Sequence, residues 1–130
     1  MNLLLPSIGN KVDLARLLGA AVHERGGRLL GSDLSPDAAA LALVDMRVEL
    51  PRFDDAAFWE VFAAVAREAG IDAVVPVRNE ELPHWAHRAE AGELPARLFI
   101  SPERTLRLCL DKAALYTAAE SAGIRCPSWQ

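Results

Sequence analysis

The stretch Asn2-Leu3-Leu4-Leu5-Pro6-Ser7-Ile8-Gly9-Asn10-Lys11 opens the chain and decides how the rest of the sequence is interpreted. Its first half, residues 2–6, is a short apolar run that is typical of a buried strand. Residues 7–11 are mostly polar and contain a glycine, so they predict a turn. A helix is expected next, with these residues on its buried face: Leu14, Leu17, Leu18 and Ala21. The chain therefore begins with a strand, a turn and a helix.

The same alternation continues along the chain. Further strand-like segments, separated by helical patterns, occur at residues 28–32, 46–50, 71–77 and 97–100. Strands that alternate with helices indicate an α/β fold, with a parallel sheet covered by helices on both faces. In a mononucleotide-binding fold the strand order begins 3-2-1 and then reverses. We therefore expect a three-layer Rossmann-like domain whose mostly parallel five-stranded sheet has the strand order 3-2-1-4-5.

This strand order also predicts where a ligand would bind. Ligands of open α/β sheets lie at the carboxyl ends of the strands, beside the point where the strand order reverses. That point falls between the first and fourth strands. Residues 7–11 and 78–81 should therefore face each other across the crevice.

Composition excludes several classes of protein. The 130 residues are 52% hydrophobic and 25% charged, which is enough apolar material for one domain with a core. A net charge of −4 argues against a general nucleic-acid binder. No apolar run approaches the ~20 residues that a membrane span needs, and the start lacks the pattern of a signal peptide. Cys109 and Cys126 form no disulfide framework, so we expect reduced thiols in a cytoplasmic protein.

The first loop is a candidate anion site. Backbone amides at a helix start can hold an anion, and we name Ser7, Gly9, Asn10 and Lys11 as candidate substrate-binding residues. The loop matches neither the dinucleotide-binding glycine pattern nor the P-loop. A plain strand-to-helix turn without a ligand therefore stays an equal alternative.

Other polar residues receive mainly structural interpretations. Asp33 ends the second strand, where an acidic residue can bind ribose, but an N-cap or an Asx-turn is favoured. Asp54 or Asp55 is expected to cap the helix that follows. His84 and His87 have a spacing that could ligate a metal, but no convincing third ligand accompanies them, so no metal site is predicted.

The segment from Asp111 to Pro127 has its own pattern. Asp111 can cap a helix, Lys112 follows at once, and Gly123 leads into Ile124-Arg-Cys-Pro127. This order predicts a short amphipathic helix, a left-handed cap and an extended exit.

Three motifs together resemble those of one family. Residues 111–127 resemble the Asp-Lys…Gly-Ile-Pro-x-Pro signature that joins the N-terminal domain of ATP-grasp ligases to their ATP-binding domains. Residues 76–82 resemble the Pro-x-x-[Asn/Asp]-x-Glu-Leu motif after strand four. Residues 7–11 are similar to the Ser-x-Gly-Arg-Arg-like loop of the carbamoyl-phosphate-synthase large-subunit-like group, although Ile8 stands where a small residue is common and Asn10-Lys11 replace the basic pair.

The resemblance implies a division of the chain and a role for it. Residues 1–110 would form the pre-ATP-grasp Rossmann-like domain, and residues 111–130 a helix and linker towards an ATP-grasp domain absent here. Such ligases use ATP and Mg²⁺ to make an acyl phosphate that an amine or thiol captures, which forms carbon–nitrogen or similar bonds. The isolated chain is then expected to be inactive, with no catalytic residues or metal ligands of its own and no tightly bound cofactor.

The resemblance also implies residue roles and partners. Glu81 aligns with a glutamate that in several relatives holds the acceptor substrate, and Asn79 lies in the same motif. Lys112 stands where a basic residue reaches the ATP phosphates. The expected partners are downstream ATP-grasp domains of the same polypeptide and a small-molecule acceptor, with no nucleic acid and no membrane; a homodimer stays open.

Two hypotheses from other classes of protein remain as alternatives. One is a stand-alone nucleotide-binding or regulatory module of flavodoxin-like topology. A receiver domain is disfavoured because Leu5-Pro6-Ser7 lacks an acidic pair for Mg²⁺. A NAD-dependent oxidoreductase is disfavoured because the glycines of the dinucleotide-binding pattern are missing. The other is a non-catalytic interaction domain whose terminal segment, with Trp129, docks onto a partner.

Overall fold

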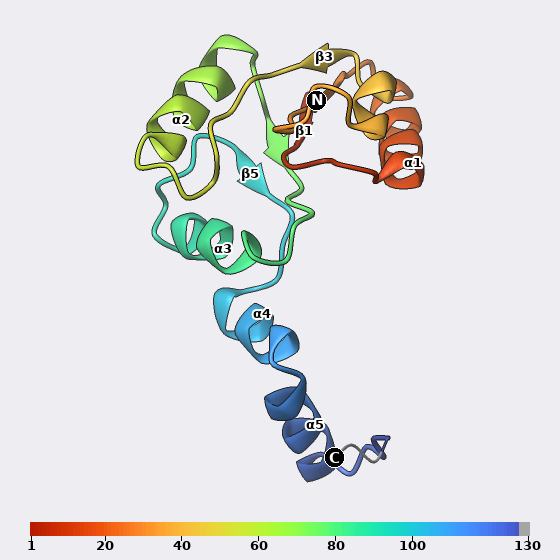
Figure 1. Ribbon diagram of the computed structural model, residues 1–130, viewed down its shortest axis with the longest axis vertical. Coiled ribbons are helices and arrows are strands. Elements are labelled where there is room, and N and C mark those ends of the chain that lie inside the picture. Colours follow the sequence, from red (N-terminus) through yellow and green to blue (C-terminus); the bar gives the residue numbers. More distant parts are fainter. Residues whose placement is uncertain (128–130) are drawn as a thin grey trace.

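Five short parallel strands form one sheet in the computed structural model, which describes residues 1–127 (Figure 1). The strands are β1 (Leu3–Leu5), β2 (Leu29–Gly31), β3 (Met46–Arg47), β4 (Ala73–Val74) and β5 (Arg97–Leu98). Their order is β3-β2-β1-β4-β5 and every pairing is parallel. The predicted α/β Rossmann-like class and strand order are confirmed.

Helices cover both faces of this sheet (Figure 1). They are α1 (Val12–His23), the 3-10 helix η1 (Ala39–Leu43), α2 (Phe58–Glu68), α3 (Leu82–Glu90), α4 (Glu103–Leu110) and α5 (Lys112–Ser121). Successive strand side chains point to opposite faces. Leu3 and Leu5 therefore join the apolar cluster beneath α1 and η1, whereas Leu4 joins the cluster beneath α2 and α3.

The buried face of α1 differs from the one predicted. Ala15, Gly19 and Val22 are buried, whereas Leu17 is 69% exposed. The reason is the close approach of the helix to the sheet: a Cβ on Gly19 would lie 3.5 Å from Leu29 Cδ2. Small residues face the strand and the leucines are rotated towards the side. The positions of the large apolar residues in the sequence therefore do not show which face of α1 is buried.

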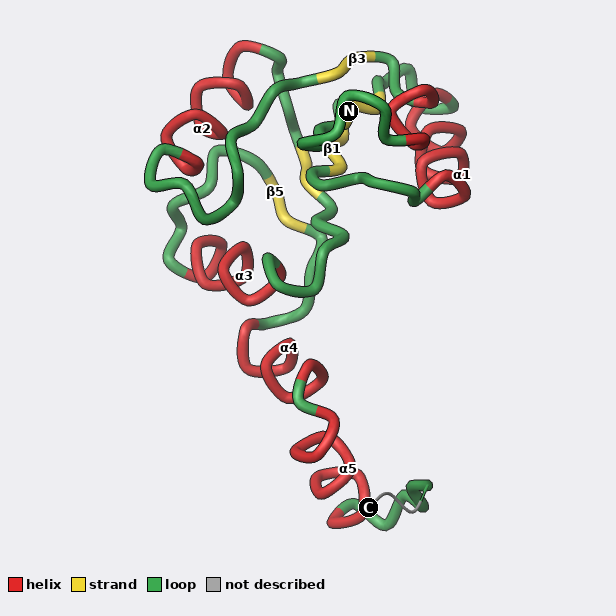
Figure 2. The backbone as a smooth tube through the Cα atoms, viewed as in Figure 1, coloured by secondary structure: helices red, strands yellow, loops and turns green. Residues whose placement is uncertain are grey.

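Helices α4 and α5 form an arm that projects from the body of the domain (Figures 1 and 2). Helix α4 packs against α3, and α5 contains no buried residue. Asp111 Oδ1 accepts a hydrogen bond from Ala114 N at 3.1 Å, and Gly123 has a φ of +75°, so the predicted cap and left-handed exit are both present. Trp129 lies outside the described residues. No helix within residues 1–127 has the length and apolar character that crossing a membrane requires.

Candidate functional site

The carboxyl ends of β1, β2 and β4 carry the loops that build the candidate site. Strand β1 lies between β2 and β4 in the sheet, so the segments after these strands meet at one edge. Ser7 follows β1, Asp33 follows β2, and Arg78 and Glu81 precede α3. The loops predicted to face each other are therefore neighbours, as the next contacts show.

A short hydrogen bond joins the two loops. Ser7 Oγ donates to Glu81 Oε1 at 2.7 Å across a separation of 74 residues. Ser7 has a φ of +51°, a left-handed conformation that is uncommon for a residue with a side chain. Such backbone strain persists where the surroundings impose it, often at binding sites. The bond fixes the orientation of the Glu81 carboxyl group.

Glu81 is the most unusual residue of the site. Only 1% of it is exposed to solvent. Its second oxygen, Oε2, is buried and accepts no hydrogen bond. Buried polar atoms are nearly always paired, because an unpaired one costs about 1–3 kcal/mol. Glu81 therefore keeps one buried acceptor without a hydrogen-bond partner at this edge of the sheet.

Arginines and carboxylates surround Glu81 at the surface. Arg78 Nη1 lies 4.0 Å from Glu81 Oε1, and Arg78 Nε donates to Glu80 Oε2 at 3.2 Å. Arg52 holds Asp54 with two hydrogen bonds of 3.0 Å. The pKa of Glu80 is lowered by its own backbone amide and by Arg78. The pKa of Asp54 is lowered by the hydrogen bond from Arg52. Both exposed carboxylates consequently stay ionised at neutral pH.

Asp33 lies beside this group, but both of its oxygens are occupied. Oδ2 accepts from Gly9 N at 2.7 Å and Oδ1 accepts from Ser35 N at 2.9 Å. The second contact is the Asx-turn that the sequence favoured over ribose binding. Gly9, with a φ of +49°, takes a left-handed conformation that a glycine adopts without strain. Asp33 therefore fastens the first loop to the second.

Two hollows have Glu81 in their walls. The inner recess has a volume of about 20 Å³ and is bordered by Ser7, Ser32 and Phe58, among others. The outer cleft has a volume of about 160 Å³ and includes Arg52, Asp54 and Glu80. Leu34, Phe53, Arg78 and Glu81 border both. Glu81 therefore lies in the wall that the two hollows share, together with two apolar side chains.

The remaining predicted residues are less closely connected. Asn10, Lys11 and Asn79 are exposed in the loops that flank the cleft. Lys112 is exposed in the first turn of α5, in the arm outside the sheet. The structure therefore brings Ser7 and Glu81 into direct contact, and Gly9 next to them through Asp33, while Lys112 lies apart.

The histidine pair is not part of this site. His87 Nδ1 lies 2.9 Å from Glu103 Oε2, which links α3 to α4. The His84 ring packs edge-on against Phe53, with centroids 5.2 Å apart. Residues 1–127 contain no group of three side chains that could hold a metal ion. The predicted capping of α2 by Asp54 or Asp55 is also indirect: Asp55 accepts from Ala57 N, but the N-cap residue itself makes no side-chain bond.

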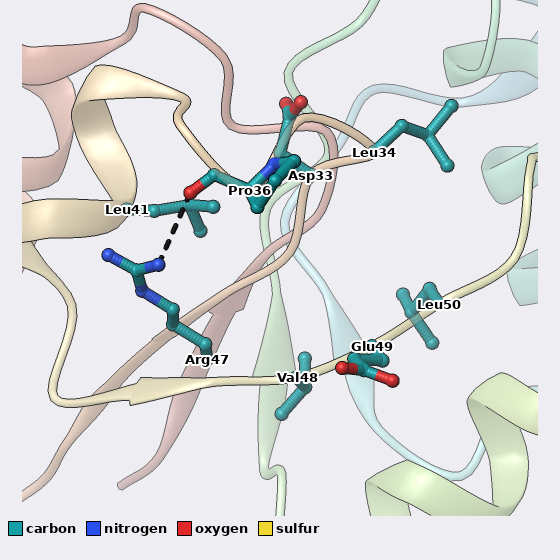
Figure 3. Close-up of a pocket in the computed structure, with 8 residues that line it drawn as sticks. All are labelled: Asp33, Leu34, Pro36, Leu41, Arg47, Val48, Glu49 and Leu50. Carbon is teal, nitrogen blue, oxygen red and sulfur yellow. Dashed lines mark hydrogen bonds between the residues drawn. The ribbon is translucent and has the colours of Figure 1, made fainter.

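Sequence reasoning missed a third, larger hollow beside β3. It has a volume of about 350 Å³ and is lined by Asp33, Leu34, Pro36, Leu41, Arg47, Val48, Glu49 and Leu50 (Figure 3). Arg47 Nη1 donates to Pro36 O at 3.2 Å on its wall. The alternation of residues 46–50 indicated a half-buried edge strand but not the space left under the loop. Arg78 was predicted to lie in the segment that faces the crevice, but it was not named as a binding residue.

The fold and the cleft define a Rossmann-like domain with a ligand cleft at the reversal of strand order. Residues 3–94 match the family model of the PylC-like N-terminal domain, and the chain belongs to this family. The expected class of protein, the N-terminal domain of an ATP-grasp ligase, is confirmed. No curated protein matches the sequence significantly.

Solved structures with the same fold include a ligase and two synthetases. The L-amino acid ligase from Bacillus licheniformis has a TM-score of 0.67 at 22% identity, covering 97% of this chain and 31% of that chain. N5-carboxyaminoimidazole ribonucleotide synthetase from Thermus thermophilus has a TM-score of 0.65 at 24% identity, covering 98% and 31%. An ADP complex of the same kind of synthetase has a TM-score of 0.70 at 16% identity, covering 99% and 31%. The chain thus spans about a third of the length of each.

Proposed function

We propose that the chain is the substrate-side domain of an ATP-grasp ligase of the carbamoyl-phosphate-synthase-like group. The observation that carries this proposal is the Ser7–Glu81 pair, which holds an unpaired, buried carboxylate oxygen at the reversal of strand order. Ligands of this fold bind at that place. The cleft would form one wall of a larger active site and hold the acceptor that captures an acyl phosphate.

ATP and Mg²⁺ would be handled mainly by domains downstream of residue 130. Of the described residues we assign Lys112 alone to the nucleotide, as a point charge near its phosphates. Its exposure and its position on the projecting arm are compatible with contact across a domain boundary. The division into residues 1–110 and 111–130, the cytoplasmic location and a homodimer are further parts of the proposal.

The test is the activity of the protein encoded by the longer reading frame. We expect about two hundred further residues that carry a glycine-rich loop, and ADP release that depends on an added small-molecule acceptor. The 130-residue chain alone should release no ADP above the buffer background. A stop codon directly after Gln130, or turnover by the short chain that a substitution within it abolishes, would contradict the proposal.

A second candidate is a non-catalytic interaction domain. The observation that favours it is the apolar surface of the arm, where Leu108, Leu110 and Ile124 are 37%, 40% and 60% exposed. Under the ligase proposal the same surface contacts the downstream domain. Alanine substitution of Leu110 and Ile124 should lower ADP release in the longer protein if the ligase proposal holds. If the chain is instead an interaction domain, the same substitutions should weaken only the binding of its partner.

A further inference from the structure

Strand β3 lies at one end of the sheet and has a neighbouring strand on one side only. The order β3-β2-β1-β4-β5 places β2 against its inner edge, and its outer edge lies at the rim of the molecule (Figure 1). The loop after β2 covers β3 on one face, where Arg47 Nη1 donates to Pro36 O (Figure 3). The outer edge itself stays open, and an open edge is a template for a further strand.

The backbone of residues 46–50 presents hydrogen-bonding groups at this outer edge. Val48 N donates to Gly31 O at 3.0 Å, so the peptide groups of Val48 point inward to β2. The N–H and C=O groups of successive residues in a strand point to opposite edges. Those of Arg47 and Glu49 therefore point outward. Pro51 has no N–H, so the outward row of donors ends at Glu49.

The side chains of the same segment divide by character between the two faces of the sheet. Met46, Val48 and Leu50 are half-buried and pack on the apolar cluster beneath α2 and α3. Arg47 and Glu49 are exposed and lie on the opposite face, because alternate side chains of a strand do so. Within residues 1–127 neither of these two side chains forms a salt bridge. The outer edge thus carries one positive and one negative charge, two residues apart.

Pairing of this segment with itself matches these charges in one antiparallel register. When Val48 lies opposite Val48 of a second copy, Arg47 of each copy lies opposite Glu49 of the other. These residues also carry the outward peptide groups, so each such pair exchanges both of its backbone hydrogen bonds. A register centred on residue 47 or on residue 49 places two arginines or two glutamates opposite each other. Opposite charges stabilise a strand pair and like charges destabilise it, which selects the register centred on Val48.

Both faces of the segment have space beside them. The hollow of about 350 Å³ lies on the side of the loop after β2 (Figure 3). A further hollow of about 370 Å³ lies between residues 46–49 and α2, where Val65, Glu68 and Ala69 line it. Side chains on either face of an added strand therefore meet open space next to residues 46–50.

We propose that a second copy of this chain adds its residues 46–50 to the outer edge of β3, antiparallel and about a two-fold axis at Val48. The two sheets join into one across an isologous interface. Residues 46–50 are fewer than the ~20–30 residues a side of a standard stable interface, so the dimer is weak and forms at about 0.1–1 mM. The inference goes beyond the proposed function, which leaves the interface of a homodimer open, and it rests on β3 alone.

The first experiment is sedimentation equilibrium of the full 130-residue chain between about 10 μM and 1 mM, with backbone-amide NMR spectra over the same range. We expect the average mass to rise from that of one chain towards that of two. The amides of Arg47 and Glu49 should shift with concentration, whereas amides of α5, far from β3, should not. A chain that stays monomeric at all these concentrations, or a dimer without shifts at residues 47 and 49, would overturn the inference.

Charge reversals test the register. Arg47→Glu and Glu49→Arg each place like charges opposite each other, so each variant alone should associate at least 10-fold more weakly than the unchanged chain. An equimolar mixture of the two variants should associate again, because every cross-strand pair then has opposite charges. The double variant Arg47→Glu/Glu49→Arg should also regain association. The control is Arg104→Glu, which changes the net charge equally at an exposed residue of α4 and should leave association unchanged.

The outcomes separate this interface from other causes of association. Association of Arg47→Glu as strong as that of the unchanged chain, no recovery in the mixture, or equal weakening by Arg104→Glu would each contradict the inference. If a variant does not fold, the concentration dependence of the Arg47 and Glu49 amides in the unchanged chain decides alone. A monomeric chain leaves the ligase proposal in place, and a dimer of a longer protein that releases no ADP leaves the interface in place.

Discussion

Two carboxyl groups at the same edge of the sheet have opposite surroundings. Asp33 accepts a backbone N–H at each oxygen, from Gly9 and Ser35. Glu81 is more deeply buried, yet it accepts only the Ser7 hydroxyl and leaves Oε2 without a partner. The paired oxygens of Asp33 stabilise the folded protein, whereas the unpaired buried oxygen of Glu81 destabilises it. The comparison indicates that Asp33 serves the fold, whereas Glu81 is held in place for something that binds.

The largest effect should follow the loss of Asp33. Asp33→Ala removes the acceptor of two backbone amides and releases the first loop from the second. Hydrogen bonds to charged groups contribute about 1.5–3 kcal/mol each, and the Ser35 contact contributes less because it is exposed. We therefore expect the free energy of unfolding to fall by about 2–4 kcal/mol. Urea denaturation measures it. The matched control is Asp37→Ala in the same loop, an exposed residue that should change stability by less than about 0.5 kcal/mol. Equal stabilities of the two variants would refute the structural role of Asp33.

Two substitutions of Ser7 distinguish the cost of the backbone strain from the contribution of the hydrogen bond to Glu81. Ser7→Ala keeps the left-handed backbone but loses the bond to Glu81, so stability should fall by about 1–2 kcal/mol. Ser7→Gly also loses the bond but relieves the strain, which costs a non-glycine residue about 1–2 kcal/mol. We therefore expect the glycine variant to be about 1 kcal/mol more stable than the alanine variant in the same denaturation experiment. A glycine variant that is less stable than the alanine variant would show that the backbone at residue 7 is not strained.

The two carboxylates also show where sequence reasoning succeeds. Alternating apolar runs and glycine turns predicted every strand, the strand order and the edge where the loops meet, because periodicity and chain topology are local signals. The Asx-turn at Asp33 was predicted for the same reason, since its partner lies two residues away. The family motif, in turn, indicated Glu81.

Long-range contacts explain what the sequence could not provide. The Ser7–Glu81 bond joins residues 74 positions apart, and the absence of a partner for Glu81 Oε2 depends on the packing around it. The rotation of α1 depended on the approach of Gly19 to Leu29, which no pattern of large apolar residues records. The hollow beside β3 results from how one loop covers a strand edge (Figure 3).

A third carboxylate, Asp45, extends the comparison to pH. Its Oδ2 contacts His23 Nε2 and accepts from Leu29 N, each at 2.7 Å. The His23 hydrogen bond, followed by the Leu29 amide, holds the pKa of Asp45 below its usual value of 3.8. A lowered folded-state pKa means that the stabilisation is complete above 3.8 and is lost as the pH falls through the lower, folded-state value.

The measurement for Asp45 is urea denaturation between pH 7 and pH 2. We expect Asp45→Asn to lose stability at neutral pH and to show a shallower decline below pH 3.8 than the unchanged chain. Parallel declines in the two proteins would mean that Asp45 contributes nothing to the acid sensitivity. Like Asp33, Asp45 is bonded to a backbone amide and should behave as a structural carboxylate.

The most direct test of the account is the stability of Glu81→Gln compared with Asp33→Asn. Glutamine keeps an oxygen for the Ser7 hydroxyl and removes the charge from a buried group without a partner for Oε2. Equilibrium urea unfolding of both variants should show Glu81→Gln within about 0.5 kcal/mol of the unchanged chain, or more stable, because glutamine can keep the Ser7 hydrogen bond and the only ionic neighbour of the group within residues 1–127, Arg78, is 4.0 Å away. Asp33→Asn should be less stable by more than about 1 kcal/mol, since the side-chain NH₂ of asparagine cannot accept from one of the two backbone N–H groups. A loss of about 2 kcal/mol or more in Glu81→Gln, equal to or larger than that in Asp33→Asn, would mean that Glu81 serves the fold and is not held for a ligand.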